Sequence, residues 1–350
     1  MYRVIQWATG TVGQSSIKAI IGRDDMELVG CYVTNEAKHG RDAGEIAGDA
    51  PVGVSATTDK AAIIATPADC VIYVPILHDI EDICALLESG KNVVTGCPYN
   101  YIPSGPERER IDAACAKGST TLLGGGIAPG QLTIVLPMLM STLSTNIRHI
   151  HVKEGGKPAE YPSPLLVGER MKFGRSLDDA YDNPNLRGWV LPWYSQSLKL
   201  TCGTMGFDID EEILSRHEVW PATEDFDTPI GFIAKGTAGA QLFEVQATVR
   251  GKPVFTYTKF WPSGAPTESP IDIQRGWEVE IEGDPTLTWS CRGFEAAFMG
   301  QMDPPVVRAT ANCLVNAVPQ TCDAAPGFAT LAELPPMSAR ADASLGRASS

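Results

Sequence analysis

The sequence predicts an α/β protein with two domains. The first is an N-terminal doubly wound parallel sheet, and the second is a C-terminal α+β domain with a mostly antiparallel sheet. In the first 150 residues, short β-branched runs alternate with helical stretches, which is typical of a parallel sheet covered on both faces. From residue 232 onward, strand patterns follow one another directly, with a hairpin signal at Gly251-Lys252-Pro253. The length of 350 residues, about twice that of a common domain, agrees with two domains.

The first domain is predicted to cover residues 1–147. Apolar runs bounded by turn residues indicate its strands, and Gly90 and Gly118 follow helical stretches that a left-handed glycine would end. The expected strands cover residues 2–7, 26–34, 70–75, 92–96 and 120–124, and the expected helices cover 14–21, 80–89 and 107–116.

The second domain is predicted to cover residues 148–337. A strand at 147–153 leads into it, and the proline-rich segment 158–185 is expected to be mostly loop. A final helix at 305–317 could pack back on the first domain. The tail 338–350, rich in Ala, Ser and Arg, is expected to be disordered. The other expected strands cover residues 239–250, 254–261, 277–282 and 286–291.

The composition excludes several functions. A net charge of −14 argues against a nucleic-acid partner, because phosphate backbones require clustered positive charge. The nine cysteines form no C-x-x-C pair, so we expect no disulfide framework and no metal site. The longest apolar stretch, 132–143, is too short to span a membrane and contains Pro137. Since the first strand begins at residue 2, we expect no signal peptide and a soluble cytoplasmic protein.

The strongest chemical signal is Ala8-Thr9-Gly10-Thr11-Val12-Gly13, which lies between the first expected strand and the first helix. It is the dinucleotide fingerprint G-x-G-x-x-G with Ala8 at the first glycine. Gly10 would let the backbone approach a pyrophosphate, Gly13 would allow close helix–strand packing, and the helix N-terminus offers free N–H groups. The alternative is an ordinary strand–helix turn. We expect a Rossmann domain whose cofactor contacts include Thr9, Gly10, Thr11, Val12 and Gly13.

The type of cofactor is usually read at the end of the second strand, where an acidic residue binds the ribose of NAD. The strand tip here carries no carboxylate, and Thr34, Asn35 and Lys38, together with Arg41, could meet a 2′-phosphate. NADP(H) is therefore favoured, while Glu36 keeps NAD(H) possible. A solvated loop is the alternative for Lys38 and Arg41.

Three further loops should surround the nicotinamide, because ligands of doubly wound sheets lie beyond the carboxyl ends of the strands. One is the loop 74–78, one begins at Gly96, and the third is the glycine-rich segment 124–130, for which a flexible turn is the alternative. The residues expected near the cofactor are Val74, Pro75, Gly96, Cys97 and Gly126.

At this point the chain resembles a known family, the dihydrodipicolinate-reductase-like oxidoreductases, in the branch of 2,4-diaminopentanoate dehydrogenase and the native amine dehydrogenases. The matching pieces occur in the family order along nearly the whole chain. The last of them adds Asn316 to the residues expected at the cofactor. The pieces are Val4-Ile5-Gln6-Trp7-Ala8-Thr9-Gly10-Thr11-Val12-Gly13, Gly40-Arg41-Asp42-Ala43-Gly44-Glu45, Gly90-Lys91-Asn92-Val93-Val94-Thr95, Gly125-Gly126-Ile127-Ala128-Pro129-Gly130 and Val315-Asn316-Ala317-Val318-Pro319.

The resemblance implies hydride transfer from NAD(P)H to an imine, and a second domain that supplies the substrate pocket and the contacts of a homodimer. In the amine dehydrogenases of this family, a glutamate just after the fifth strand handles the proton of ammonia. This chain departs there, since Gly96-Cys97-Pro98-Tyr99 contains no carboxylate. The catalytic Lys and His of the dihydrodipicolinate reductases also find no match in residues 151–157.

Three residues remain as catalytic candidates: Tyr99, Glu154 and Tyr161. Tyrosine is suited to donating a proton to a developing alkoxide, so Tyr99 favours carbonyl or alcohol chemistry, or else it is a pocket wall. Glu154 ends the strand that leaves the first domain, where it could point into a cleft, or else it is a loop carboxylate. Tyr161 lies in the matching region of the family, or else it is a turn residue.

The sequence therefore predicts an NAD(P)H-dependent oxidoreductase that transfers hydride to a C=N or C=O carbon of a small or medium apolar substrate, as in reductive amination. The first alternative is a carbonyl, alcohol or C=C oxidoreductase that uses no ammonia. The second is a sensor that binds NADPH without catalysis.

Overall fold

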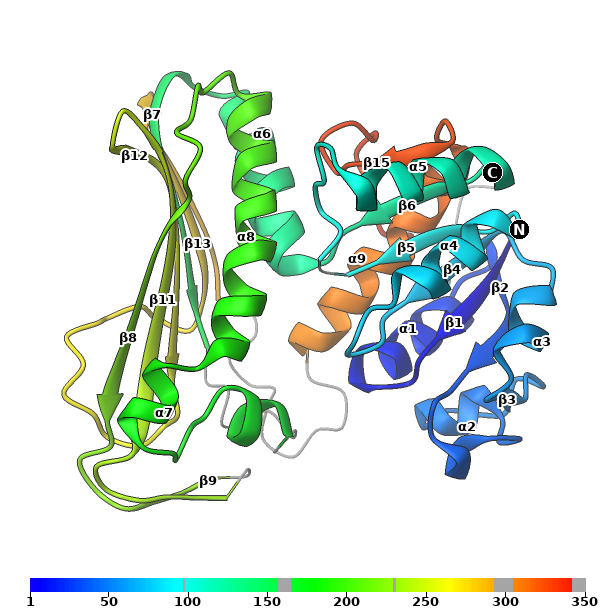
Figure 1. Cartoon of the computed structure of the whole chain (residues 1–350), viewed down its shortest axis with the longest axis horizontal. Coiled ribbons are helices and arrows are strands. Elements are labelled where there is room, and N and C mark those ends of the chain that lie inside the picture. Colours follow the sequence, from blue (N-terminus) through cyan, green and yellow to red (C-terminus); the bar gives the residue numbers. More distant parts are fainter. Residues whose placement is uncertain (97, 157–164, 229–230, 293–304, 342–350) are drawn as a thin grey trace. The chain divides into compact units, whose positions relative to one another are not determined.

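The computed structural model describes residues 1–96, 98–156, 165–228, 231–292 and 305–341 (Figure 1). The chain divides into two compact units. Unit 1 comprises Met1–Ile127 and Val306–Ser350, and unit 2 comprises Ala128–Pro305.

Unit 1 is built on a seven-stranded parallel sheet of order β15-β6-β5-β4-β1-β2-β3. Its central strands are buried on both faces, so they consist of continuous apolar runs. The five strands expected from the sequence are confirmed, and the short strands β3 and β15 are additional. The strands are β1 (Tyr2–Trp7), β2 (Met26–Tyr32), β3 (Ala56–Thr57), β4 (Cys70–Tyr73), β5 (Asn92–Thr95), β6 (Thr121–Gly124) and β15 (Gly327–Ala329).

Helices connect these strands. Asp42, Asp59 and Asp79 begin three of them, each accepting a hydrogen bond from a backbone N–H of the first turn. The three expected helices are present, and α2 and α3 are additional. The helices of this unit are α1 (Thr11–Ile21), the 3₁₀ turn η1 (Glu36–Lys38), α2 (Ala43–Ala47), α3 (Lys60–Ala65), α4 (Ile80–Glu88), α5 (Pro106–Gly118) and α9 (Pro305–Asp323).

Unit 2 is built on a six-stranded sheet of order β14-β13-β7-β12-β11-β8, in which only β7 and β12 run parallel. The expected mostly antiparallel sheet is confirmed. Two short strands, β9 and β10, form a separate antiparallel pair. The strands are β7 (Thr145–Gly155), β8 (Leu214–Pro221), β9 (Phe226–Thr228), β10 (Gly231–Ile233), β11 (Ala238–Val249), β12 (Lys252–Pro262), β13 (Gly276–Asp284) and β14 (Leu287–Cys291).

Helices α6 and α8 cover one face of this sheet (Figure 1). Helix α8 falls at the end of the segment expected to be loop, and it forms although it contains Pro192. Packing against β11 and β12 compensates for its weak helix propensity, and Thr201 Oγ1 donates a hydrogen bond to the Thr133 carbonyl 2.6 Å away. The helical segments are η2 (Ile127–Val135), α6 (Leu136–Ser141), η4 (Leu165–Arg170), α7 (Leu177–Tyr181) and α8 (Pro184–Thr204).

Three expectations differ from the structure in detail. The division between the units lies at residue 127 rather than 147, because α6 packs on β7 and β13. The hairpin turn is Arg250-Gly251, with φ angles of 53° and 75°, so Pro253 lies within β12. Arg340 of the expected tail donates a hydrogen bond of 2.9 Å to Asp25, while residues 342–350 lie outside the described part.

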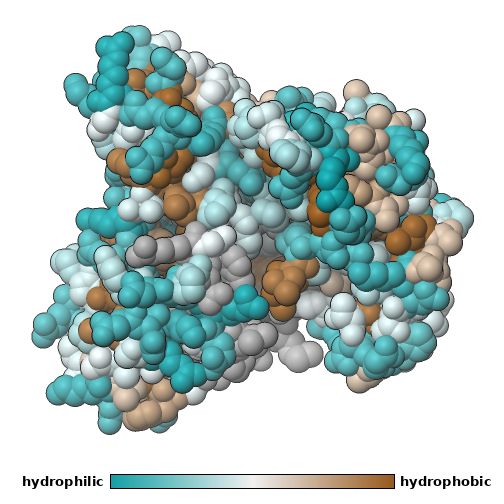
Figure 2. Space-filling view, in the orientation of Figure 1, coloured by the Kyte–Doolittle hydropathy of each residue, from teal (hydrophilic) through white to brown (hydrophobic). Residues whose placement is uncertain are grey.

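In the part of the chain that the structure describes, no helix is long and apolar enough to cross a membrane. The visible face of the molecule is mostly hydrophilic with scattered apolar patches (Figure 2), in keeping with a net charge of −14.

Candidate active site

The glycine loop lies at the carboxyl end of β1, where it leads into α1. Ala8 has a φ of +72°, the left-handed conformation in which the fingerprint normally places glycine. A Cβ added to Gly13 would lie only 2.1 Å from the Ala8 carbonyl oxygen, so helix and strand can meet only at a glycine. Gly10 faces open space, and no side chain caps the helix N-terminus. This combination fits the pyrophosphate of a dinucleotide.

Three long polar side chains hold the loop in place. Gln6 Nε2 donates to the Ala8 carbonyl at 2.8 Å, and Gln14 Nε2 donates to the Thr9 carbonyl at 3.1 Å. Lys38 Nζ lies 2.8 Å from the same Thr9 carbonyl and 3.0 Å from Thr9 Oγ1. Burial lowers the pKa of Lys38. Lys38 therefore lies at the dinucleotide loop, as its place after the second strand suggested.

Thr34 and Asn35, which were also expected near the cofactor, have different environments. Thr34 is exposed just after β2. Asn35 caps η1, because its Oδ1 accepts a hydrogen bond from the Ala37 N–H at 2.9 Å. Its amide oxygen is thus already engaged in holding the loop that carries Lys38.

The loops after β4, β5 and β6 meet at the same edge of the sheet. The Val74 N–H donates to the Trp7 carbonyl at 3.2 Å, and the Gly125 N–H donates to the Thr95 carbonyl at 2.8 Å. A Cβ on Gly124 would lie 1.6 Å from the Tyr99 carbonyl oxygen, so the loop after β5 crosses directly over β6. The expected nicotinamide residues Val74, Pro75, Gly96 and Gly126 come from these loops, whereas Cys97 lies outside the described residues.

Tyr99 is a buried part of the core, only 4% exposed. Its hydroxyl lies 3.3 Å from Glu107 Oε1, to which it donates. Burial and the Glu107 charge raise the pKa of Tyr99. In the structure, the Tyr99 hydroxyl is therefore engaged with Glu107 and its ring is part of the hydrophobic core.

His78 lies in the loop after β4 and was not among the candidates. Its Nε2 lies 3.2 Å from Thr95 Oγ1, at the end of β5. Its place just beyond a buried strand could have marked His78 as a candidate from the sequence. Its hydrogen bond to the neighbouring strand could not be predicted from the sequence.

One other candidate, Asn316, is not brought to this edge. Asn316 Oδ1 accepts a hydrogen bond of 2.7 Å from Arg23, which follows the C-terminal end of α1, the end away from the glycine loop. Tyr161 lies outside the described residues.

In unit 2, Glu154 belongs to a buried polar cluster. One carboxylate oxygen accepts a hydrogen bond of 2.5 Å from the Tyr257 hydroxyl, and the other lies 2.9 Å from Lys259 Nζ. The hydroxyls of Tyr257 and Tyr194 are 2.7 Å apart, and their rings stack. Lys259 also lies over the ring of Trp261, 4.7 Å from its centroid. Glu154 is thus a partly buried carboxylate with a cation and a hydroxyl donor.

The register of the sheet explains this cluster. Lys259 pairs with Glu154 across the parallel β7–β12 ladder, and Tyr257 and Trp261 are two residues from Lys259 on the same face. Burial and the adjacent Glu154 charge raise the pKa of Tyr257, which therefore stays protonated and donates. Lys259 was not predicted from the sequence. The period-two alternation of β12 indicates that Lys259 lies on the same face of the strand as Tyr257 and Trp261.

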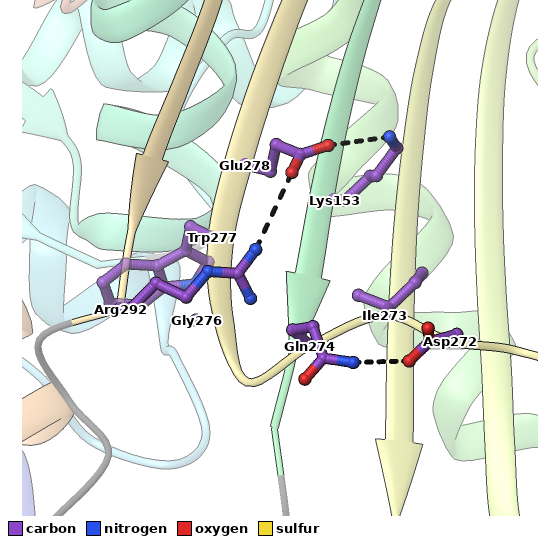
Figure 3. Close-up of a pocket in the computed structure, with 8 residues that line it drawn as sticks. All are labelled: Lys153, Asp272, Ile273, Gln274, Gly276, Trp277, Glu278 and Arg292. Carbon is purple, nitrogen blue, oxygen red and sulfur yellow. Dashed lines mark hydrogen bonds and ion pairs between the residues drawn. The ribbon is translucent and has the colours of Figure 1, made fainter.

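The neighbouring Lys153 points to the opposite face, where it lines a small pocket with Glu278 and Arg292 (Figure 3). Lys153 Nζ lies 2.8 Å from Glu278 Oε1, and Arg292 lies 3.9 Å from the other oxygen of Glu278. Both cations have a carboxylate partner, so this pocket offers little net charge to a ligand. Among the described residues, no group of three or more His, Cys, Asp or Glu side chains could hold a metal ion.

Comparisons with known proteins show the family to which the chain is related. A family model described as dihydrodipicolinate reductase, N-terminus, matches residues 4–97. An amine dehydrogenase from Streptomyces virginiae is 31% identical over 356 residues, covering 96% of both proteins. A 4-hydroxy-tetrahydrodipicolinate reductase from Gloeothece citriformis is 39% identical over 121 residues, which cover 35% of this chain and 36% of that protein.

Solved structures support the fold. An amine dehydrogenase from Mycobacterium smegmatis superposes with a TM-score of 0.77 at 19% identity, covering 97% of both chains. An NAD binding oxidoreductase from Klebsiella pneumoniae superposes with a TM-score of 0.50 at 11% identity, covering 94% of this chain and 92% of that one.

The glycine loop, the parallel sheet and these matches together define an NAD(P)-dependent oxidoreductase with an N-terminal domain like that of dihydrodipicolinate reductase. Within that class, the chain belongs to the amine dehydrogenase family, to which it is related along nearly its whole length. The resemblance noted from the sequence is thereby confirmed.

Proposed function

We propose that this protein catalyses NAD(P)H-dependent reductive amination of a small or medium apolar ketone or aldehyde. The observation that carries this proposal is the Glu154 carboxylate, held between Lys259 and Tyr257 in a family of amine dehydrogenases. The bound cofactor supplies a hydride to the carbon of the C=N bond. The residues of this chain must handle the protons and the positive charge on nitrogen.

Glu154 is suited to both tasks. Ammonium must lose a proton before its nitrogen attacks a carbonyl, and the protonated imine that then forms after loss of water is a cation. Each carboxylate oxygen has two acceptor sites, so Glu154 can accept a further proton or hydrogen bond beside those from Lys259 and Tyr257. Lys259 and the tyrosine pair fix the orientation of the carboxylate.

The test is NADPH oxidation with a panel of apolar ketones, with and without ammonium. We expect turnover to require ammonium, and Glu154→Gln to lower kcat by about 100-fold or more. Glu278→Gln is the matched control, because Glu278 is also paired with a lysine of this sheet but on the opposite face. Full activity of Glu154→Gln would contradict the assigned role.

A second candidate is ammonia-independent reduction of a carbonyl. It is favoured by one observation: the segment from Gly96 to Pro106, just after β5, contains no carboxylate. Equal rates of NADPH oxidation with and without ammonium, and a secondary alcohol as product, would establish this activity in place of amination.

For the cofactor, we propose a preference for NADP(H), supported by Lys38 beside the glycine loop. Lys38→Met should weaken NADPH binding about tenfold or more and NADH binding much less, since only NADPH carries the 2′-phosphate. Lys60→Met serves as control, because Lys60 is paired with Asp82 instead. Equal losses for both cofactors would show that Lys38 only supports the loop.

We further propose that unit 1 binds the cofactor, and that unit 2 binds the substrate and forms a homodimer in the cytoplasm. The relationship to amine dehydrogenases supports these assignments. Sedimentation equilibrium of the purified protein should give twice the chain mass of 37.5 kDa. A monomer at micromolar concentration would contradict the dimer.

A further inference from the structure

We propose that His78 positions the nicotinamide, with its Nδ1 accepting a hydrogen bond from the carboxamide N–H of the cofactor. The inference rests on dinucleotide binding by unit 1 and is independent of the amine chemistry proposed above.

The hydrogen bonds around Thr95 determine which nitrogen of His78 carries the proton. Thr95 Oγ1 lies 2.8 Å from the Tyr73 carbonyl oxygen, which can only accept a hydrogen bond. The single hydroxyl proton of Thr95 is therefore donated to this carbonyl. The same oxygen lies 3.2 Å from His78 Nε2 and must therefore accept a hydrogen bond from it. In the neutral ring, Nε2 is then the donor and Nδ1 the acceptor.

The ring is held firmly by its neighbours. Its centroid lies 5.7 Å from that of Tyr73 and 6.0 Å from that of Tyr99, which meets it edge-on. Burial lowers the pKa of His78 to about 4, so the ring is neutral around pH 7. Within the described residues, no hydrogen bond reaches Nδ1, which leaves a fixed, neutral acceptor.

The position of this acceptor points to the cofactor. His78 lies beyond the carboxyl end of β4 and is bonded to the end of β5, at the edge where ligands of doubly wound sheets bind. The two residues before it, Ile76 and Leu77, are 70% and 67% exposed. The nicotinamide is a flat aromatic ring that carries one amide group. Exposed apolar side chains can contact its ring, and a fixed acceptor can bind its amide N–H.

A neutral acceptor suits a neutral donor better than it suits ammonium. A base with a pKa near 4 would take a proton from ammonium only against a large free-energy difference, because proton transfer is efficient when the pKa lies near the working pH. The carboxamide NH₂ group donates without transferring its proton. This difference favours a positioning role over that of a general base.

The test combines a change in the protein with a change in the ligand. NADP⁺ carries the carboxamide NH₂, and its 3-acetylpyridine analogue replaces that group by a methyl ketone without a donor. Dissociation constants are measured by calorimetry for both ligands with the wild type, His78→Leu and His78→Gln. The control is His39→Leu, since His39 of the same unit bonds to Thr58.

We expect the wild type and His39→Leu to bind NADP⁺ about fivefold to tenfold more tightly than the analogue, as one neutral hydrogen bond would allow. His78→Leu should bind both ligands equally, and His78→Gln, which keeps an acceptor, should recover part of the difference. Undiminished discrimination by His78→Leu, with an unchanged melting temperature, would overturn the inference. Loss of all binding already in the wild type would instead refute dinucleotide binding itself.

Discussion

Gly10 and Gly13 belong to one motif, yet each is a glycine for a different physical reason. The backbone at Gly10 has a φ of −69°, which any residue adopts, and a Cβ there would meet no protein atom within 4 Å. The space beside Gly10 is therefore available to a ligand. At Gly13 that space is filled by the Ala8 carbonyl, so the requirement comes from the fold itself.

This difference predicts opposite phenotypes. Gly13→Ala should lower the free energy of unfolding by about 3 kcal/mol, because its Cβ would overlap a backbone oxygen. Gly10→Val should change it by less than about 1 kcal/mol while abolishing NADPH binding. Thermal unfolding and NADPH fluorescence titration of both variants measure this. Tight NADPH binding by a folded Gly10→Val protein would refute the phosphate-loop assignment.

Two of the catalytic candidates, Tyr99 and Glu154, have different surroundings in the structure. Tyr99 follows the nicotinamide loop in sequence, but its hydroxyl is bonded to Glu107 of α5 and its ring is buried. Glu154 lay in a less specific sequence context, and it proves to be the centre of the polar cluster with Lys259 and Tyr257. The partners, which come from other elements, distinguish the two residues.

At the scale of elements, helices and strands with a strong local sequence pattern were predicted, and those with a weak pattern were not. The strands of unit 1 were predicted because both of their faces are buried and their sequences are continuously apolar. Helix α8 was missed because Pro192 and several Gly, Ser and Thr residues lower its propensity, and β15 was missed because it has only three residues. Both depend on packing against distant parts of the chain.

Two glycines, one in a turn and one in a helix, are predicted to have opposite effects on stability when replaced by alanine. Gly251, in the turn between β11 and β12, has a φ of +75°, so Gly251→Ala should lower the free energy of unfolding by about 1 kcal/mol. Gly203, in the last turn of α8, has open space around it, so Gly203→Ala should raise it by about 0.5 kcal/mol. Urea denaturation measures both. Equal effects would show that backbone conformation is not the cause.

At the scale of the whole molecule, unit 1 is assembled from both ends of the chain. Strand β15 extends the parallel sheet beside β6, and Asn316 of α9 bonds to Arg23. Asp25 lies between Arg23 and Arg340 and accepts hydrogen bonds from both. The C-terminal segment is therefore a structural part of the cofactor-binding unit.

The Asp25 cluster predicts a pH dependence of stability. The hydrogen bond from Arg23, reinforced by Arg340, lowers the pKa of Asp25 to about 2, despite the opposing effect of burial. A lowered carboxyl pKa stabilises the fold above the usual value near 4, and this contribution is lost as the pH falls toward 2. Asp25→Asn should therefore destabilise the protein at pH 6 and less so at pH 3.

Denaturant unfolding of the wild type and Asp25→Asn at both pH values provides the measurement. Arg340→Ala, which removes only the C-terminal contact, should have the smaller effect. A difference between the wild type and Asp25→Asn that stays constant from pH 6 to pH 3 would show that the ion pairs do not contribute.

The sequence by itself determined the fold class, the dinucleotide loop and the family. These features depend on local patterns: buried parallel strands are continuous apolar runs, and a pyrophosphate requires glycine and a free helix N-terminus within a few residues. Only the tertiary structure decided which polar side chains meet. Glu154 and Lys259 are far apart in the chain, and His78, which follows β4, bonds to Thr95 at the end of the neighbouring strand β5. Sheet register and packing determine such pairs, and the local sequence around either residue does not specify its partner.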